Sequence, residues 1–218
     1  MKPHLFPLLF GILSHFPTNA QLPVDREPHH SVILQNDHIR ILDGHIRAHD
    51  TTPAHLHAAN SVVVFLSSSK FAIRQPGHRP VITKVNAGDM KYTGYGDKPV
   101  THVVWNESPS VFHFFVVELL KTHRPGAPCP ALSQPGLQLQ WEQPAVRAYY
   151  LQPPAGQPVH LPASSCARLL IDVSGTVAVT SSTGTITRQP EGFVYLPPGS
   201  NQVTVRGNHS RSILLDIP

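Results

Sequence analysis

The sequence predicts an all-β protein of the antiparallel sandwich, barrel or jelly-roll class. Proline supplies 23 of the 218 residues, about twice its average share, and each proline inside a helix removes a backbone donor. Short apolar and β-branched runs recur between turn residues such as Gly77 and Gly88, which is typical of strands. No window of helical length spaces its apolar residues three and four apart. These observations exclude an all-helical fold and favour a sandwich, barrel or jelly roll.

The first twenty residues have the layout of a secretory signal peptide. Lys2 gives a positive start, residues 5–16 are mostly apolar, and Thr18 and Ala20 are small residues at the two positions that a signal peptidase reads. The apolar stretch is shorter than the roughly 20 residues of a membrane anchor. We expect a leader over residues 1–20, a secreted or periplasmic protein and no membrane span. The alternative is a buried N-terminal segment.

Residues 21–121 are predicted to form a β domain. Its expected strands are Ile39–Ile46, Val62–Leu66, Phe71–Arg74, Val81–Val85, Val100–Trp105 and Val111–Leu120. The sequence Gln-Pro-Gly-His at 75–78 predicts a hairpin turn, because proline fixes one torsion and glycine accepts the left-handed one.

A Pro-rich linker is expected over residues 122–143, where prolines and glycines gather and apolar residues are few. A second β-rich series follows in residues 144–218. Its expected strands are Ala148–Leu151, Arg168–Val173, Thr176–Thr180, Thr185–Arg188, Phe193–Leu196, Val203–Arg206 and Ser212–Ile217. Ser61–Ile73 lies over Ala167–Val179 without a gap, so we interpret the chain as two tandem, unequal copies of one β domain. A single larger β domain is the alternative.

The charge pattern argues against nucleic acid as a partner, and the number of histidines suggests metal binding. The net charge of +4 reflects only 13 acidic residues against 17 basic ones, and no run of Lys or Arg forms a patch suited to nucleic acid. Histidine is in excess, with 15 residues, which favours metal binding or proton chemistry. Export would favour oxidation of Cys129 and Cys166, but the sequence does not decide whether they pair.

Three histidines are spaced for a metal site. His55 and His57 are two apart, so on an extended segment their imidazoles project from the same face. Gly88 and then His102 and Asn106 follow, the last two also sharing a face if that segment is a strand. Neighbouring strands would gather three imidazoles, a donor set that suits Fe, Mn, Ni, Cu or Zn.

This arrangement resembles the two motifs of the cupin superfamily. The first motif has a His-x-His pair, matched by His55 and His57, and the second opens on a Gly and ends on a His and an Asn, matched by Gly88, His102 and Asn106. The resemblance implies a cupin jelly-roll barrel with His55, His57 and His102 as metal ligands. It also implies that Asn106 is a structural residue of its strand.

The sequence departs from the cupin pattern in two ways. The glutamate of the first motif is absent, and Asn60, Ser61 and Val62 occupy its window. In the second copy the positions over the three histidines are expected to be Leu161, Ala163 and Val203. That copy is therefore expected to serve packing or dimerisation, with a homodimer among the expected assemblies.

Other histidines and aromatic residues have weaker assignments. His45, His49 and His113 are candidates for a fourth ligand or a proton shuttle, against the alternative of exposed or internally satisfied histidines. His29 and His30 are expected in a solvated tail. Tyr92 and Tyr95 are candidates for the wall of a pocket, and Trp105 is expected in the core.

Two functions follow from these features. The first is an exported metal-binding cupin, an oxygenase or isomerase that acts on a small anionic organic molecule and whose catalytic residues are unknown. The second is a non-catalytic module that binds a ligand or a metal, favoured by the missing glutamate, by the second copy without ligands and by the lack of a general base beside the histidines. A structural β protein, whose histidines only form hydrogen bonds, is a third interpretation.

Overall fold

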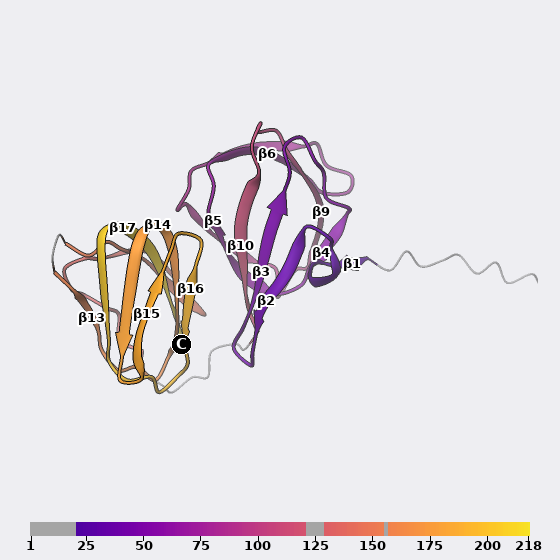
Figure 1. The fold of residues 1–218 in the computed structure, drawn as a ribbon. Helices are drawn as coiled ribbons and strands as arrows, with labels where there is room; N and C mark the ends of the chain where they lie inside the picture. Colours follow the sequence, from indigo (N-terminus) through magenta and orange to yellow (C-terminus); the bar gives the residue numbers. More distant parts are fainter. Residues whose placement is uncertain (1–20, 121–128, 155–156) are drawn as a thin grey trace, which may run out of the picture.

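The computed structural model describes residues 21–120, 129–154 and 157–218. Within these residues the regular structure is strand, apart from one turn of 3₁₀ helix, and there is no α-helix, so the predicted fold class is confirmed. The strands form two curled bodies, one from each half of the chain (Figure 1). The expected leader and the first residues of the expected linker, 122–128, lie outside the described residues. A search of the described part for a helix able to cross a membrane found none.

The N-terminal half comprises β1–β10 and one turn of 3₁₀ helix, η1 (Val24–Arg26). Its strands are β1 (Leu22–Pro23), β2 (His30–Gln35), β3 (Ile39–Ile46), β4 (His55–His57), β5 (Asn60–Phe65), β6 (Ser69–Arg74), β7 (Val81–Val85), β8 (Met90–Gly94), β9 (Val100–Asn106) and β10 (Phe112–Leu119). They form two five-stranded sheets, in the orders β1-β4-β9-β6-β7 and β2-β3-β10-β5-β8.

The C-terminal half comprises β11–β17. Its strands are β11 (Leu137–Gln143), β12 (Val146–Leu151), β13 (Val159–Leu161), β14 (Ala167–Ser181), β15 (Gly184–Arg188), β16 (Phe193–Leu196) and β17 (Val203–Ile217). They form one sheet in the order β11-β12-β17-β14-β15, with β13 paired to β17 and β16 paired to β14.

The order of neighbouring strands is the same in the two halves. The series β2-β3-β10-β5-β8 corresponds to β11-β12-β17-β14-β16, and β4-β9-β6-β7 corresponds to β13-β17-β14-β15. Strand β14 thus takes the places of β5 and β6, and β17 takes those of β9 and β10. This order agrees with the spacing match in the sequence, while descent from one duplicated domain stays a prediction.

Two pairs of expected strands are each one long strand. Arg168–Val173 and Thr176–Thr180 both belong to β14, whose register against β17 shifts around Ser174. The expected break at residues 174–175 is instead a β-bulge within the strand, where Gly175 adopts a φ of 72°. The expected strands over 203–206 and 212–217 are likewise parts of β17.

The expected linker is partly wrong. Residues 137–143, its last seven, form β11, which pairs with β12. Leu137, Leu139 and Trp141 alternate with polar residues, the pattern of a half-buried strand, but the prolines before them masked it. The structure therefore begins the second β series at Leu137.

One hydrophobic core joins the two halves. From the N-terminal half it takes the outer face of β3, β5 and β10, and from the C-terminal half the facing side chains of β12, β14 and β17. Its fully buried members include Ile39, Ile41, Val62, Val117, Ala148, Leu169, Ile171, Ile213 and Leu215. Alternation along β3 sends Leu42 and Ile46 to the opposite face, into the interior of the N-terminal half.

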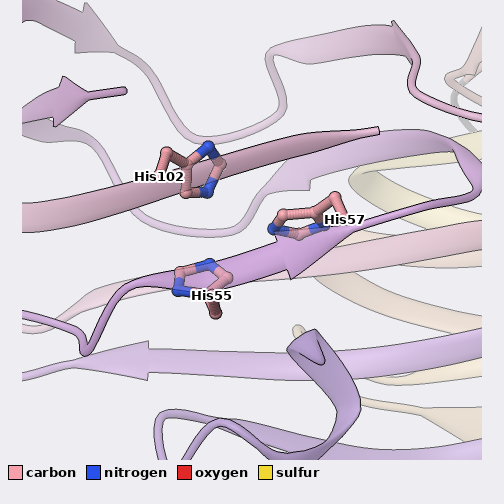
Figure 2. Close-up of side chains that lie close together, drawn as sticks. All are labelled: His55, His57 and His102. Carbon is pink, nitrogen blue, oxygen red and sulfur yellow. The ribbon is translucent and has the colours of Figure 1, made fainter. Parts of the chain in front are cut away.

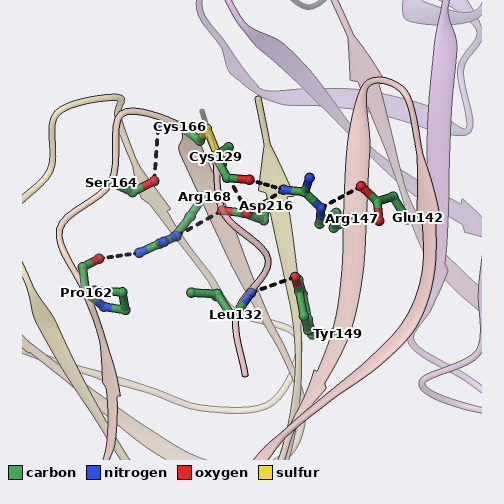
Figure 3. The surroundings of a disulfide bond; sticks show 10 residues. All are labelled: Cys129, Leu132, Glu142, Arg147, Tyr149, Pro162, Ser164, Cys166, Arg168 and Asp216. Atoms are coloured by element: carbon green, nitrogen blue, oxygen red, sulfur yellow. Dashed lines mark hydrogen bonds and ion pairs between the residues drawn. A yellow bond between two sulfur atoms is a disulfide. The ribbon is translucent and has the colours of Figure 1, made fainter. Parts of the chain in front are cut away.

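A disulfide between Cys129 and Cys166 settles the pairing that the sequence left open. It lies at one end of the C-terminal half, beside a buried ionic cluster (Figure 3). The carboxylate of Asp216, fully buried, accepts a hydrogen bond of 3.0 Å from Nε of Arg168, itself only 5% exposed. The guanidinium of Arg147 lies 3.7 Å from the other oxygen of Asp216 and donates to the carbonyl of Cys129.

Gly44 allows an aromatic ring to lie flat on β3. A Cβ at this position would lie 2.4 Å from the ring of Phe114, its partner on β10. We expect Gly44→Ala to push that ring aside and to lower the free energy of unfolding by about 1–3 kcal/mol, measured by urea denaturation. Gly94→Ala is the control, because its Cβ would meet only Tyr92 at 3.7 Å. Equal stability of the two variants would contradict the close packing at Gly44.

Candidate metal centre

The structure brings the three predicted histidines together inside the N-terminal half (Figure 2). His55 and His57 lie on β4, and His102 lies on β9 directly opposite His55. Each residue offers a ring nitrogen within 4.8 Å of those of the other two. The ring centroids are 4.7 Å apart for His55 and His102, 4.9 Å for His57 and His102, and 5.1 Å for His55 and His57. The spacing of two along β4 and the pairing of β4 with β9 produce this cluster.

His55 is oriented with one nitrogen free. Its Nδ1 lies 2.9 Å from the carbonyl of Pro53 and donates to it, which leaves Nε2 as the acceptor. This Nε2 is buried and has no hydrogen-bond partner among the residues that the structure describes. A backbone carbonyl that fixes the tautomer of a histidine is a common feature around bound metals, so the donor set fits a divalent metal.

Burial keeps the triad neutral. It lowers the pKa of His57 to about 2, with the neighbouring imidazoles of His102 and His55 adding to the effect. Burial and then the imidazoles of His55 and His30 lower the pKa of His102 to about 3. The pKa of His55 is also lowered by burial. Neutral imidazoles are the form that binds a metal, so the site needs no deprotonation near neutral pH.

Asn106 ties the end of β9 to two loops, as the resemblance implied. Its side-chain amide is buried and donates to the carbonyls of Ile46, Arg47 and Ser110 at 2.7–3.1 Å. Its oxygen accepts from the backbone of Ser108 at 2.8 Å. These bonds anchor the strand that carries His102 and leave no role for Asn106 as a ligand.

The window of the missing glutamate holds hydroxyl groups. Ser61 and Thr93 face each other across β5 and β8 with their oxygens 2.6 Å apart, and both line the cavity beside the triad. The structure therefore agrees with the sequence that the first motif supplies no carboxylate ligand.

The sequence analysis was wrong about His30, which is buried and not in a solvated tail. Its ring centroid lies 5.1 Å from that of His55 and 6.1 Å from that of His57. Nδ1 of His30 lies 2.5 Å from the carboxylate of Glu27, which is itself 1% exposed. Burial alone would raise the pKa of Glu27, but hydrogen bonds from His30 and His29 outweigh this effect and lower the pKa to about 2. A carboxylate-oriented imidazole thus lies beside the triad.

No motif pointed to this pair. Glu27 and His30 lie three residues apart near the start of the described residues, where the Pro-His-His sequence at 28–30 gives no periodic pattern. One signal in the sequence could have pointed to the pair: Glu27 is one of few carboxylates in the chain, and it stands close to two histidines.

The triad opens into an apolar cavity of about 480 Å³ in the interior of the N-terminal half. Valine and phenylalanine are the most frequent apolar residues of its wall, which also carries one cation, Lys91, and one acidic residue, Asp89. Trp141 and Tyr150 of the C-terminal half also contribute to the wall. A cavity of this size and lining suits a small organic molecule.

The candidate wall residues are only partly correct. Tyr95 lines the cavity, with its ring centroid 5.8 Å from that of His57. Tyr92 packs instead on Trp141, at 6.4 Å between centroids. His45, His49 and His113 do not join the triad: His49 is exposed, and the other two lie on the outer face of β3 and β10.

The C-terminal half has apolar residues where the triad would be. Strand pairing places Val159, Leu161 and Val205 at the positions of His55, His57 and His102, and all three are buried. The sequence alignment, which chose Leu161, Ala163 and Val203, was therefore shifted by two residues. Its conclusion that these positions hold no metal ligands is unchanged.

Comparison of the sequence with known proteins gives no relative, since no family model and no curated protein matches it. Comparison of the structure gives several. The bacterial pirin YhhW of Escherichia coli, solved with nickel(II), is 15% identical with a TM-score of 0.63, over 87% of this chain and 90% of that one. Protein YlbA of E. coli is 9% identical with a TM-score of 0.63, over 87% and 82%.

A third similar structure is salicylate 1,2-dioxygenase from Pseudoaminobacter salicylatoxidans with gentisate. It is 11% identical with a TM-score of 0.62, over 85% of this chain and 70% of that one. Identities this low are evidence of a shared fold. The similar structures are cupin-fold proteins, and the protein described here has the cupin fold.

Proposed function

We propose that the protein is an exported metal-binding cupin in which His55, His57 and His102 hold a divalent transition metal. The observation that carries this proposal is the buried, unpartnered Nε2 of His55, which lies among neutral imidazoles at the end of a cavity. An unpaired buried nitrogen costs about 1–3 kcal/mol, and a metal ion would remove that cost. The similar structures support the proposal, since one was solved with nickel and another is a dioxygenase.

The ligand that suits this cavity is a small anionic organic molecule. A divalent ion held by three neutral imidazoles keeps its full positive charge, while Lys91 and Asp89 on the wall carry opposite charges. The apolar remainder of the wall suits a flat carbon skeleton, such as that of a catechol or an aromatic hydroxy acid. A bound metal would polarise an oxygen of such a molecule as a Lewis acid.

We further propose that the activity is that of an oxygenase or isomerase. His30 is the cavity histidine outside the triad, and its bond to Glu27 leaves Nε2 to accept a proton from a bound molecule. This pair removes one of the three arguments for a non-catalytic module, the lack of a general base. The other two remain: the first motif lacks its glutamate, and the C-terminal half lacks ligands.

Metal content is the direct test. We expect the protein, purified without chelator and measured by inductively coupled plasma mass spectrometry, to hold one metal equivalent more than the triple variant His55→Val, His57→Leu, His102→Val. That variant copies the buried residues at the matching C-terminal positions and should fold. His57→Ala should lose the same equivalent. Equal metal content in all three proteins would refute the proposal.

Turnover separates the two functions. We expect oxygen uptake or conversion with a panel of catechols and hydroxy acids, and its loss in the triple variant. Binding of these molecules without conversion would favour the non-catalytic module. Export is tested separately: a mature chain that begins at residue 21, found by intact mass after expression with the leader, supports it.

A further inference from the structure

A second group of metal-binding side chains lies outside the triad, on the outer face of the N-terminal half. His45 on β3 and His113 on β10 are directly paired across the two strands, and Asp43 is two residues from His45 on the same face. The three residues offer donor atoms within 4.8 Å of one another. Period-two alternation also places them on the face that carries Ile41 and Phe115, which pack against the C-terminal half.

The carboxylate of Asp43 lies between the two imidazoles. Its Oδ1 is 2.9 Å from Nε2 of His113 and 3.3 Å from Nδ1 of His45. The two rings are stacked with centroids 4.0 Å apart. Donor atoms around a tetrahedral zinc ion lie about 3.3 Å apart, as follows from bonds of about 2.0 Å. The separations from Asp43 are therefore close to those of a metal-bound set.

The C-terminal half supplies a carboxylate on the other side of His113. Glu191, in the turn before β16, has a carboxylate oxygen 3.4 Å from Nδ1 of His113, whereas Asp43 lies at Nε2. The two ring nitrogens point to opposite sides of the imidazole, so an ion bound at Nε2 leaves Glu191 to accept a hydrogen bond from Nδ1. The neighbouring contact between Phe115 and Phe193, at 6.1 Å between ring centroids, holds this turn near β10. Glu191 thus orients His113 from the C-terminal half, as carboxylates commonly orient a metal-bound histidine.

An ion can reach this group from solvent. The side chains of His45 and Glu191 are 51% and 54% exposed, that of Asp43 is 25% exposed and that of His113 is 10% exposed. A metal lies in the plane of each imidazole that binds it, so the His45 ring must turn out of the stack. Its exposure leaves room for that rotation.

We propose that Asp43, His45 and His113 form a second divalent-metal site, of a chemistry that suits zinc, and that Glu191 orients His113 and so links the two halves of the chain. Mixed imidazole and carboxylate donors are a common zinc set. The ion would replace the contact between His113 and Asp43 by three bonds to one centre, while Nδ1 of His113 keeps its contact with Glu191. This site does not depend on the triad, because the two groups share no residue.

Zinc stoichiometry in the triple variant tests the site, since that protein lacks the triad. After equilibrium dialysis against zinc we expect about one bound equivalent, which His45→Ala added to the same background removes. His78→Ala, at an exposed turn, is the matched control and should keep it. The same count with and without His45 would overturn the proposal.

Two further measurements separate the parts of the proposal. Glu191→Gln should weaken zinc binding at least about tenfold, or 1.4 kcal/mol, and an unchanged affinity would overturn the link between the halves. In the otherwise native chain, His45→Ala should lower the zinc count from two to one. If the triad binds no metal, the native chain holds a single equivalent that His45→Ala removes and His57→Ala does not.

Discussion

Replacing Arg168 by methionine is expected to lower the free energy of unfolding by about 3–5 kcal/mol, because it leaves a buried carboxylate without its main partner. Asp216 is fully buried, and its burial already raises its pKa despite the hydrogen bond from Arg168 and the nearby charge of Arg147. After the substitution only Arg147 remains, at 3.7 Å. Urea denaturation of the oxidised protein at pH 7 would measure the loss.

The loss of stability in the Arg168→Met variant should depend on pH. A protonated Asp216 needs no cation, so the loss of stability should shrink as the pH falls toward the raised pKa of Asp216. The double variant Arg168→Met, Asp216→Leu should recover most of the loss, since an apolar pair removes the uncompensated charge. The partly exposed surface pair of Lys70 and Glu107 is the control, and Lys70→Ala should cost far less stability than Arg168→Met. Equal losses for Arg168→Met and Lys70→Ala would contradict the structure.

The affinity of the triad for a metal is expected to be nearly independent of pH between 7.5 and 5.5. Three histidines of ordinary pKa, about 6.5, would each be about nine-tenths protonated at pH 5.5, and competition from protons would weaken binding about a thousandfold. Here burial lowers the pKa of His57 to about 2 and that of His102 to about 3, and also lowers that of His55. The native site takes up no protons in this range, so the affinity should change by less than about tenfold.

Competition titrations with a metal chelator of known pH dependence would measure this affinity. The stability of the metal-free protein, unlike its affinity for metal, should depend on pH. Since the folded pKa values lie below those of the unfolded chain, only the unfolded state gains protons as the pH falls below about 6.5. The metal-free protein should therefore lose stability toward acid relative to the triple variant. A thousandfold fall in affinity at pH 5.5, with the protein still folded, would show that the histidines are not buried as described.

The fold was largely predictable because most strands carry their own signal. Ile39–Ile46, Val81–Val85 and Phe193–Leu196 form strands with the expected bounds, since each is a short apolar or β-branched run between turn residues. The strand Leu137–Gln143 was missed, because the signal from the flanking prolines outweighed its alternation. The long strand β14 was divided in two, because Gly175 within its bulge looks like a turn in the sequence. The strand β17 was divided at the polar run that begins at Gly207.

The three histidines could be predicted for a similar reason. A spacing of two along an extended segment is a local property, and the cupin pattern supplied the distant His102. Glu27 and His30 could not be found in this way, because their place beside the triad depends on how β2 folds over the N-terminal half. The cluster of His45 and His113 depends in addition on the register of β3 against β10.

The core shared by the two halves has a consequence for mutational tolerance. The C-terminal half has apolar side chains at Val159, Leu161 and Val205, where the other half has histidines, yet its outer face completes the burial of Ile39, Ile41 and Val117. Substitutions in its interior need only preserve volume, whereas substitutions on its outer face act on both halves at once. The C-terminal half thus has a structural role. It covers the apolar side of the N-terminal half and contributes Trp141 and Tyr150 to the cavity beside the triad.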